Sequence, residues 1–316
     1  MPQGILIESG QVRINAELHG TLVNQPPTAV AGPDQRVECN QTGGATFTLD
    51  GSDSFDPDNN VAFFGWFKGS RTGPLVGTLP RIQLEQPVKN TTSYVFKVID
   101  AFGQYDEDVT TVAVVDTTAP TVTVPPDRKA ECAGPTGTPV ALGTATASDV
   151  CDASPAIGNN APPLFALGST TVTWSARDAS ENVGFAMQRV LIVDTTPPEL
   201  MVTLSPAVLW PPNHKLAPIT ASITVQDTCD PSPTVRLVSI TSNEADNGLG
   251  DGDTSADIQG TAFGTDDRTF LLRAERSGPG GGRVYTVTYE ASDHSGNTTL
   301  RKATVTVPKN QQVFAQ

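Results

Sequence analysis

Apolar and polar residues alternate over short stretches of this chain, and no stretch of ten or more residues keeps a helical period. The clearest runs are YVFKVIDAFGQ at 94–104, TVTWSARDASEN at 171–182 and VTYEASDHSGN at 287–297. Clusters of Gly, Pro, Asn and Asp, which are typical of turns, separate such runs. The pattern predicts an all-β chain built from sandwich or barrel modules.

Two nearly identical segments interrupt the β-pattern, VVDTTAP at 114–120 and IVDTTPP at 192–198. In each, a strand end is followed by an aspartate and by proline, which stops regular pairing. We interpret both segments as linkers that divide the chain into a tandem array of three immunoglobulin-like β-sandwich modules. The predicted parts are an N-terminal strand segment (1–24), three modules (25–116, 117–194 and 195–308) and a tail (309–316).

Each module repeats two acidic loops. The first holds a DxxD pair: Asp53/Asp56, Asp149/Asp152 and Asp227/Asp230. The second holds an aspartate followed four residues later by an amide: Asp100/Gln104, Asp178/Asn182 and Asp293/Asn297. In an immunoglobulin-like sandwich the loop after the second strand and the loop before the last strand lie at the same end. Because the chain also enters the module there, we expect each linker aspartate to lie beside both loops of the module that follows.

This arrangement leads to the hypothesis of a Ca²⁺ site at each module junction, because calcium takes about six to eight oxygen ligands from carboxylates, amides and backbone carbonyls. The predicted ligands are Asp116, Asp149, Asp152, Asp178 and Asn182 at one junction, and Asp194, Asp227, Asp230, Asp293 and Asn297 at the other. In the first module the candidates are Asp53, Asp56 and Asp100, where Asn24 stands in place of the linker aspartate and predicts an intramodular or weaker site. Turn formation by Asp and Asn is the alternative explanation.

A further acidic loop at 242–258 contains Asp246, Asp251 and Asp253. It is either a flexible acidic insertion or a separate Ca²⁺ site.

The charge balance limits the possible partners. The 316 residues contain 34 Asp and Glu against 20 Lys and Arg, a net charge of −14, which argues against binding to nucleic acid. No apolar run is long enough to span a bilayer, so no membrane insertion is expected. The first ten residues show no signal peptide, so we expect either a removed export signal or a segment of a longer chain.

The same loops carry a resemblance to known families. AVAGPDQRVECN, LDGSDSFDPDNN and FKVIDAFG resemble a PKD domain over 27–115, and DTTAPTVTVPPD, ECAGPTG and ASDVCD closely resemble a hyalin repeat (HYR) domain over 117–194. The third module, with LWPPNHKL, is similar to a longer immunoglobulin-like module of bacterial surface proteins. The resemblance implies secreted or cell-surface modules that are non-catalytic and have adhesive or matrix-like roles.

The HYR resemblance also implies a disulfide between Cys132 and Cys151. A disulfide in turn implies an oxidising compartment. Cys39 and Cys229 are each alone in their modules. They are expected to be free buried thiols or to form an intermolecular link.

No catalytic group is expected. Asp293, His294 and Ser295 have the residue types of a hydrolytic triad, but adjacent side chains point apart, whereas triad members meet in space. The chain is therefore not expected to be an enzyme.

Two features keep alternative functions open. Residues 11–19, QVRINAELH, alternate strictly and predict a strand without a sheet of its own: an extra edge strand, the remnant of a preceding domain, or a donor strand that builds a filament. Trp210, between Leu209 and two prolines, could stack on sugars in an accessory region of a secreted hydrolase. The expected partners are other extracellular proteins or further copies of the chain, with polysaccharide as an alternative.

Overall fold

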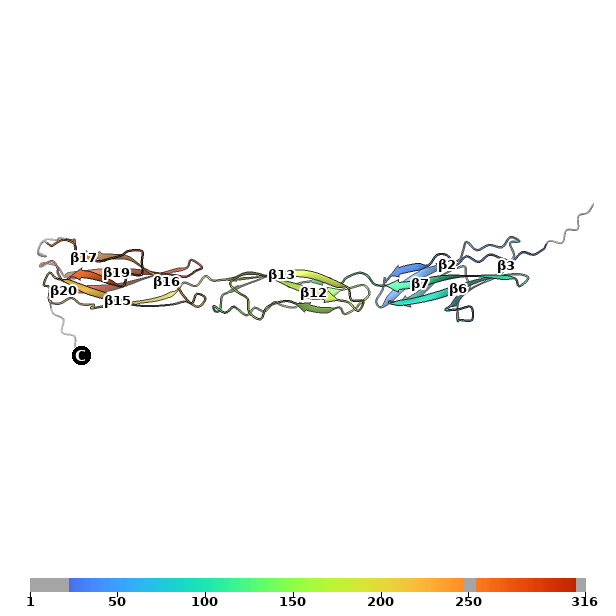
Figure 1. Ribbon diagram of the computed structural model, residues 1–316, viewed down its shortest axis with the longest axis horizontal. Helices are drawn as coiled ribbons and strands as arrows, with labels where there is room; N and C mark the ends of the chain where they lie inside the picture. The colour runs from blue at the N-terminus through green and yellow to red at the C-terminus, as the bar shows by residue number, and fades with distance from the viewer. Residues whose placement is uncertain (1–22, 247–253, 311–316) are drawn as a thin grey trace, which may run out of the picture. The chain divides into compact units, whose positions relative to one another are not determined.

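The computed structural model describes residues 23–246 and 254–310. Its regular elements are all β-strands, which confirms the predicted all-β class (Figure 1). Buried apolar side chains gather in three separate cores, within residues 29–114, 122–192 and 200–307, as expected for a tandem array of β-sandwiches. Within the two described ranges, no helix has the length and apolar character that crossing a membrane requires.

The first module holds two sheets around an aromatic core. Its strands are β1 (Gln35–Glu38), β2 (Gly44–Asp50), β3 (Val61–Lys68), β4 (Leu75–Gly77), β5 (Arg81–Pro87), β6 (Asn90–Asp100) and β7 (Tyr105–Val115). One sheet has the order β1-β7-β6-β3-β4, and β2 pairs with β5 in the other. Trp66 is fully buried and stacks on Phe96 at a centroid distance of 4.2 Å. Such a pair contributes about 1 kcal/mol beyond the area it buries.

The second module is smaller. Its strands are β8 (Thr121–Thr123), β9 (Arg128–Glu131), β10 (Thr146–Ser148), β11 (Ala156–Asn159), β12 (Gly168–Arg177) and β13 (Val183–Val193). The main sheet has the order β11-β12-β13-β9, and β8 pairs with β10. Gly184 near the start of β13 leaves room for the linker, because a Cβ there would stand 1.8 Å from the carbonyl oxygen of Pro120.

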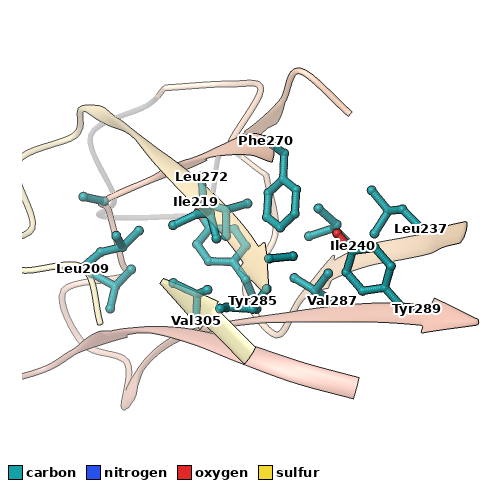
Figure 2. Packing of buried hydrophobic residues seen from close by; sticks show 14 of the residues in the cluster. Leu209, Ile219, Leu237, Ile240, Phe270, Leu272, Tyr285, Val287, Tyr289 and Val305 are labelled. Carbon is teal, nitrogen blue, oxygen red and sulfur yellow. The ribbon is translucent and has the colours of Figure 1, made fainter. Parts of the chain in front are cut away.

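The third module is the largest. Its strands are β14 (Glu199–Ser205), β15 (Leu216–Gln226), β16 (Thr234–Ser242), β17 (Ile258–Gln259), β18 (Thr269–Arg273), β19 (Gly282–Ser292) and β20 (Thr298–Pro308). They form the sheets β14-β15-β18-β17 and β16-β19-β20. Figure 2 shows side chains of both sheets meeting in the core, among them Ile219, Phe270, Val287 and Val305.

A short parallel pairing recurs beside the last strand of every module. Glu38 lies opposite Val115 where β1 pairs with β7, and Glu131 lies opposite Val193 where β9 pairs with β13. In the third module a single parallel bridge joins Val208 to Thr306. We call this the exit end of a module, because the last strand leaves there. The entry end is the opposite end, with the DxxD loop, which follows β2, β10 or β15, and the loop before the last strand.

Backbone contacts divide the chain into two compact units. One unit holds the residues up to Thr121 together with Ala147–Ala156 and Ala176–Gly184. The other holds Val122–Thr146, Ile157–Ser175 and the residues from Phe185 onward. The first linker and the entry loops that follow it therefore belong to one unit, and the second linker and its entry loops belong to the other.

Two buried tyrosines in the third core predict an alkaline unfolding transition. Tyr285 and Tyr289 are fully buried (Figure 2), and burial raises the pKa of each from 10.0 to about 12. A raised pKa means that the stabilisation is complete below pH 10.0 and is lost as the pH rises towards about 12. We expect the free energy of unfolding of this module to fall by up to about 3 kcal/mol per tyrosine across that window, measured by urea unfolding. Tyr289→Phe should remove its share of this pH dependence, and an unchanged pH dependence in that variant would contradict the assignment.

Candidate metal sites at the two linkers

The loop before the last strand is braced in the same way after both linkers. Asn182 donates its backbone N–H to Asp178 Oδ1 at 2.8 Å and its side-chain amide to Asp178 Oδ2 at 2.9 Å. The same amide donates to the linker carbonyl of Asp116 at 3.1 Å. Asn297 repeats these contacts with Asp293 and with the carbonyl of Asp194, at 2.8, 2.8 and 3.1 Å. Each asparagine thus ties a buried carboxylate to the linker backbone, and its amide nitrogen faces the site.

In the DxxD loops after the two linkers, backbone N–H groups bind one carboxylate oxygen of the first aspartate and leave its other oxygen available for a ligand. Asp149 Oδ1 accepts the backbone N–H groups of Cys151 and Asp152 at 2.7 and 2.9 Å. Asp227 Oδ1 accepts those of Cys229 and Asp230, both at 2.8 Å. The second oxygen of Asp227 is buried and has no hydrogen-bond partner. A buried carboxylate oxygen without a donor is costly unless a proton or a cation reaches it.

The second aspartate of each DxxD pair has a different role. Asp152 accepts the backbone N–H groups of Ser154 and Ala179, each at 2.9 Å. Asp230 Oδ1 accepts the N–H of Ser232 at 2.8 Å, and Asp230 Oδ2 accepts the N–H of His294 at 2.9 Å. These carboxylates therefore hold the two entry loops together.

The linker aspartates complete two clusters of carboxylates. One oxygen each of Asp194, Asp227 and Asp293 lies within 4.8 Å of the others, and we call these residues the second-linker site. After the first linker, Asp116 and Asp149 gather in the same way with the sulfur of Cys151. That sulfur belongs to a disulfide, so it is not a thiolate ligand. We call Asp116 and Asp149, together with Asp178, whose charge acts on Asp116, the first-linker site.

The electrostatics of the first-linker site favour a positive partner. Burial raises the pKa of the Asp116 carboxyl, and repulsion from Asp178 and Asp149 adds to the rise. Hydrogen bonds from the Ser180 hydroxyl and the Thr118 N–H offset it only in part. Neighbouring carboxylates repel one another unless a proton or a cation is bound.

The first module differs at its entry end. The side-chain amide of Asn24 donates to Asp100 Oδ2 at 2.6 Å, in the place where a linker carboxylate stands in the other modules. Asp53 is exposed, whereas Asp56 is buried with Oδ2 unpartnered. Among residues 23–246 and 254–310, clusters of three potential ligands occur at the two linkers and not here. The metal role predicted for these three aspartates stays a prediction.

The loop at 242–258 lies only partly within the described residues. Asp246 is exposed and accepts the backbone N–H groups of Ala256 and Asp257 at 3.0 and 2.8 Å. Asp251 and Asp253 lie outside the part of the chain that the structure describes. Asp246 therefore closes the neck of this loop.

The cysteine pairing corrects the expectation from the sequence. The disulfides are Cys39–Cys151 and Cys132–Cys229, with Cα–Cα distances of 5.8 and 6.0 Å. The predicted Cys132–Cys151 bridge is therefore wrong, as are both alternatives predicted for Cys39 and Cys229, free thiols and an intermolecular link. The backbone N–H of Cys132 donates to Val193, the last residue of β13, so this cysteine lies at the exit end. Cys151 lies at the entry end, roughly 30 Å away along β13, whereas bridged Cα atoms stand about 6 Å apart. Each bridge therefore joins the exit end of one module to the entry end of the next.

Two glutamates that were not singled out in the sequence bind the linkers. Glu38 accepts the backbone N–H of Thr117 at 2.6 Å and the hydroxyl groups of Thr117 and Thr118 at 3.0 and 3.2 Å. Glu131 accepts the same groups of Thr195 and Thr196 at 2.6, 3.1 and 3.3 Å. The signal was present in the repeated Glu-Cys and Asp-Thr-Thr sequences, which only together indicate a contact.

The residues that resemble a triad bind elsewhere. His294 Nδ1 lies 2.6 Å from Asp230 Oδ2, and the Ser295 hydroxyl donates to Asp194 Oδ2 at 3.0 Å. The hydrogen bond with Asp230 raises the pKa of the exposed His294 imidazole. Both residues thus hold the linker and the entry loops together.

Comparison with known proteins identifies one module by family. Residues 115–190 match the HYR domain model. No curated protein matches this chain. The resemblance of residues 27–115 to a PKD domain remains a prediction.

Several solved structures are similar to this chain at low sequence identity. They include a 1.5-MDa bacterial ice-binding adhesin (12% identity, 90% of this chain and 98% of that chain, TM-score 0.39) and mouse cadherin-23 EC22–24 (14%, 90% and 98%, 0.31). The fibronectin(III)-like modules of Clostridium thermocellum CbhA are a third (14%, 52% and 93%, 0.23). At TM-scores this low the alignments carry no conclusion about function. The chain is a tandem array of β-sandwich modules, and residues 115–190 match the HYR domain model.

Proposed function

We propose that this protein is a non-catalytic structural or adhesive module array of the extracellular space, in which Ca²⁺ stiffens the module junctions. The observation that carries the proposal is the repeated linker. At both linkers an aspartate of the connection lies close to an aspartate of the following DxxD loop, beside a disulfide and a glutamate that binds the connection. Flexible spacers between modules would not require neighbouring carboxylates, a disulfide and a glutamate contact at the same point.

The disulfides support the extracellular assignment. Structural disulfides persist in oxidising compartments and are rare in the cytosol. Both bridges here join modules that already have cores of their own. Their contribution is therefore to the connection between modules as well as to the folding of each one.

The donor set of the linker sites fits calcium. Carboxylate oxygens are hard ligands of the kind that Ca²⁺ prefers, and no nitrogen or thiolate ligand is present in either set. Asp116, Asp149 and Asp178 would hold one ion, and Asp194, Asp227 and Asp293 the other. The unpartnered Oδ2 of Asp227 and the raised pKa of Asp116 are the features that a bound cation would relieve. Asn182, Asn297, Asp152 and Asp230 would orient these ligands through the hydrogen bonds described above.

Calcium titration tests this proposal directly. We expect isothermal titration calorimetry to show two saturable sites per chain and thermal unfolding to move to higher temperature with calcium than with EDTA. At a free calcium concentration about 100 times the dissociation constant, each site should add about 2.7 kcal/mol of stability. Asp227→Asn should remove one site and Asp116→Asn the other.

Asp53→Asn is the matched control, because this exposed aspartate of the first DxxD pair lies outside both linker clusters. It should leave two sites. Heat signals that do not saturate, or melting that is the same in calcium and EDTA, would refute the calcium role. Those results would leave the disulfide-linked module array standing.

A further inference from the structure

The three entry ends share two hydrogen-bond patterns that align their loops, while the N–H of Phe55 donates to the Thr28 carbonyl and those of Cys151 and Cys229 donate to the first aspartate of their loops. Asp56, Asp152 and Asp230 each accept the backbone N–H two residues later through Oδ1, at 2.7, 2.9 and 2.8 Å. The loops before the last strand match in the same way, since the residue four positions after Asp100, Asp178 or Asp293 donates its backbone N–H to that aspartate. Phe55 therefore occupies the position of Cys151 and Cys229, and Phe102 that of Ser180 and Ser295.

At these positions the first module has exposed phenylalanines, whereas the other two modules have a cysteine and a serine. Phe55 is 56% exposed and Phe102 is 75% exposed. In the other modules the equivalent residues form the disulfide and donate a hydroxyl hydrogen bond to the linker aspartate. The linker aspartate itself is replaced by Asn24. Exposed aromatic side chains at the positions of an internal junction indicate a junction of a different, apolar kind.

The exit end of the third module carries the corresponding changes. The last strands β13 and β20 have the same length, so Pro308 at the end of β20 aligns with Val193 at the end of β13. Because Val208 lies opposite Thr306, Trp210 lies opposite Pro308, at the position that Glu38 and Glu131 hold in the other modules. Pro211 takes the position of Cys39 and Cys132, and Lys309 that of the linker aspartates. Trp210 is 40% exposed and borders a groove of about 460 Å³, lined also by Leu209, Pro211 and Lys215.

We propose that the entry end of the first module docks onto the exit end of the third module of a second copy of this chain. The cysteine, glutamate and serine positions of the internal junctions hold apolar residues in this pair, and Lys309 stands in place of a linker aspartate. The Cys–Cys contact becomes Phe55 against Pro211, and the Trp210 groove offers a place for a phenyl ring. The exposed Lys309 and Lys215 face a loop with the exposed carboxylates of Asp53 and Asp58.

The expected contact is reversible and builds a head-to-tail chain of copies. Internal junctions are closed by a covalent bridge, whereas the contact between copies has only apolar burial and charge attraction. A head-to-tail contact uses two different patches, so it continues from copy to copy instead of stopping at a dimer. The inference does not rest on the calcium role proposed above, because neither patch includes a linker site.

Directed disulfide formation provides the sharpest test. Phe55→Cys and Pro211→Cys put thiols at the positions that are bridged in the internal junctions, here on two separate full-length chains. Mixing the two variants under mild oxidation should give a covalent product of twice the chain mass on a non-reducing gel. Each variant alone should give much less. Equal yields for mixed and single variants would overturn the proposal, because they would show random collision.

Sedimentation of the full chain over a concentration series gives the second readout, in calcium and in EDTA. We expect reversible association that Phe55→Ser with Phe102→Ser weakens at least about tenfold, and Trp210→Ala likewise. Phe185→Ser with Met187→Ser is the matched control, because these side chains are 68% and 71% exposed on the middle module and should not matter.

Deletion of residues 1–22 separates this contact from a donor strand and should leave association intact. A monomer at all concentrations would overturn the proposal. So would association that is lost with this deletion but unaffected by the aromatic variants. Loss of calcium binding without loss of association would affect only the proposed function.

Discussion

Replacing Cys132 and Cys229 together by serine is expected to lower the free energy of unfolding by about 3 to 5 kcal/mol. The replacement of Cys39 with Cys151 should cost a similar amount. The bridges span 97 and 112 residues of sequence, and cross-links over such long loops remove the most conformational entropy from the unfolded chain. Urea unfolding of the oxidised protein measures the loss. Reductant breaks both bridges, so it should reproduce the sum of the two losses in the native chain and change nothing in a variant without cysteine.

A third variant distinguishes the observed pairing from a bridge inside the HYR domain. Cys132→Ser with Cys151→Ser removes one partner from each bridge, so it should cost as much as both matched replacements together. A Cys132–Cys151 bridge would make this same variant the loss of a single bridge. Thiol titration of the unfolded, unreduced chain should find no free thiol in the native sequence, whereas two free thiols would contradict the structure.

The β-sandwiches could be predicted from the sequence because a period of two, bounded by turn residues, has few other interpretations. The runs at 94–104, 171–182 and 287–297 became β6, β12 and β19 with the loops that follow them. Register between those runs also placed Asp100, Asp178 and Asp293 at equivalent positions, because the same loop length follows each strand. The sequence could not show that Asp149 is a candidate metal ligand whereas Asp152 holds the two entry loops together. The difference lies in which backbone N–H groups donate to each carboxylate.

The cysteine pairing could not be predicted because it depends on strand direction. Cys132 and Cys151 share a module and are 19 positions apart by number, which favours a local bridge. The parallel pairing of β9 with β13 places one at the exit end and the other at the entry end. A short parallel strand of four residues gives no pattern by which its direction can be read from the sequence.

Arg283→Met is expected to destabilise the third module by about 3 to 5 kcal/mol, because it removes the buried cation that pairs with one oxygen of the Asp257 carboxylate. Arg283 is fully buried and its Nη1 pairs with Oδ2 of Asp257, which is 3% exposed. Burial raises the pKa of Asp257, and the bond with Arg283 offsets this only in part. Without the guanidinium, Asp257 keeps a single ion pair, to Arg273 Nε at 3.1 Å. Urea unfolding at neutral pH measures the difference.

Arg268→Met is the matched control. Arg268 pairs with Asp266 at 2.9 Å, but both side chains are nearly half exposed, and such pairs contribute less than about 1 kcal/mol. Adding Asp257→Asn to Arg283→Met should restore part of the stability, because a neutral amide leaves no buried charge. Equal costs for Arg268→Met and Arg283→Met would show that the buried pair contributes no more than a surface pair.

The position of Arg283 adds a local consequence to this loss of stability. Its Nη2 donates to the carbonyl of Ala245 at 3.2 Å, and its Nε lies 3.3 Å from Glu244 Oε2. Arg283 thus contacts both ends of the loop at 242–258: Glu244 and Ala245 near its start and Asp257 near its end. Because one buried cation fastens both sides, Arg283→Met should open the neck of this loop before the core unfolds. Proteolysis within 242–258 should therefore accelerate in Arg283→Met under native conditions and stay unchanged in Arg268→Met. Equal cleavage rates in the two variants would mean that other contacts hold the neck.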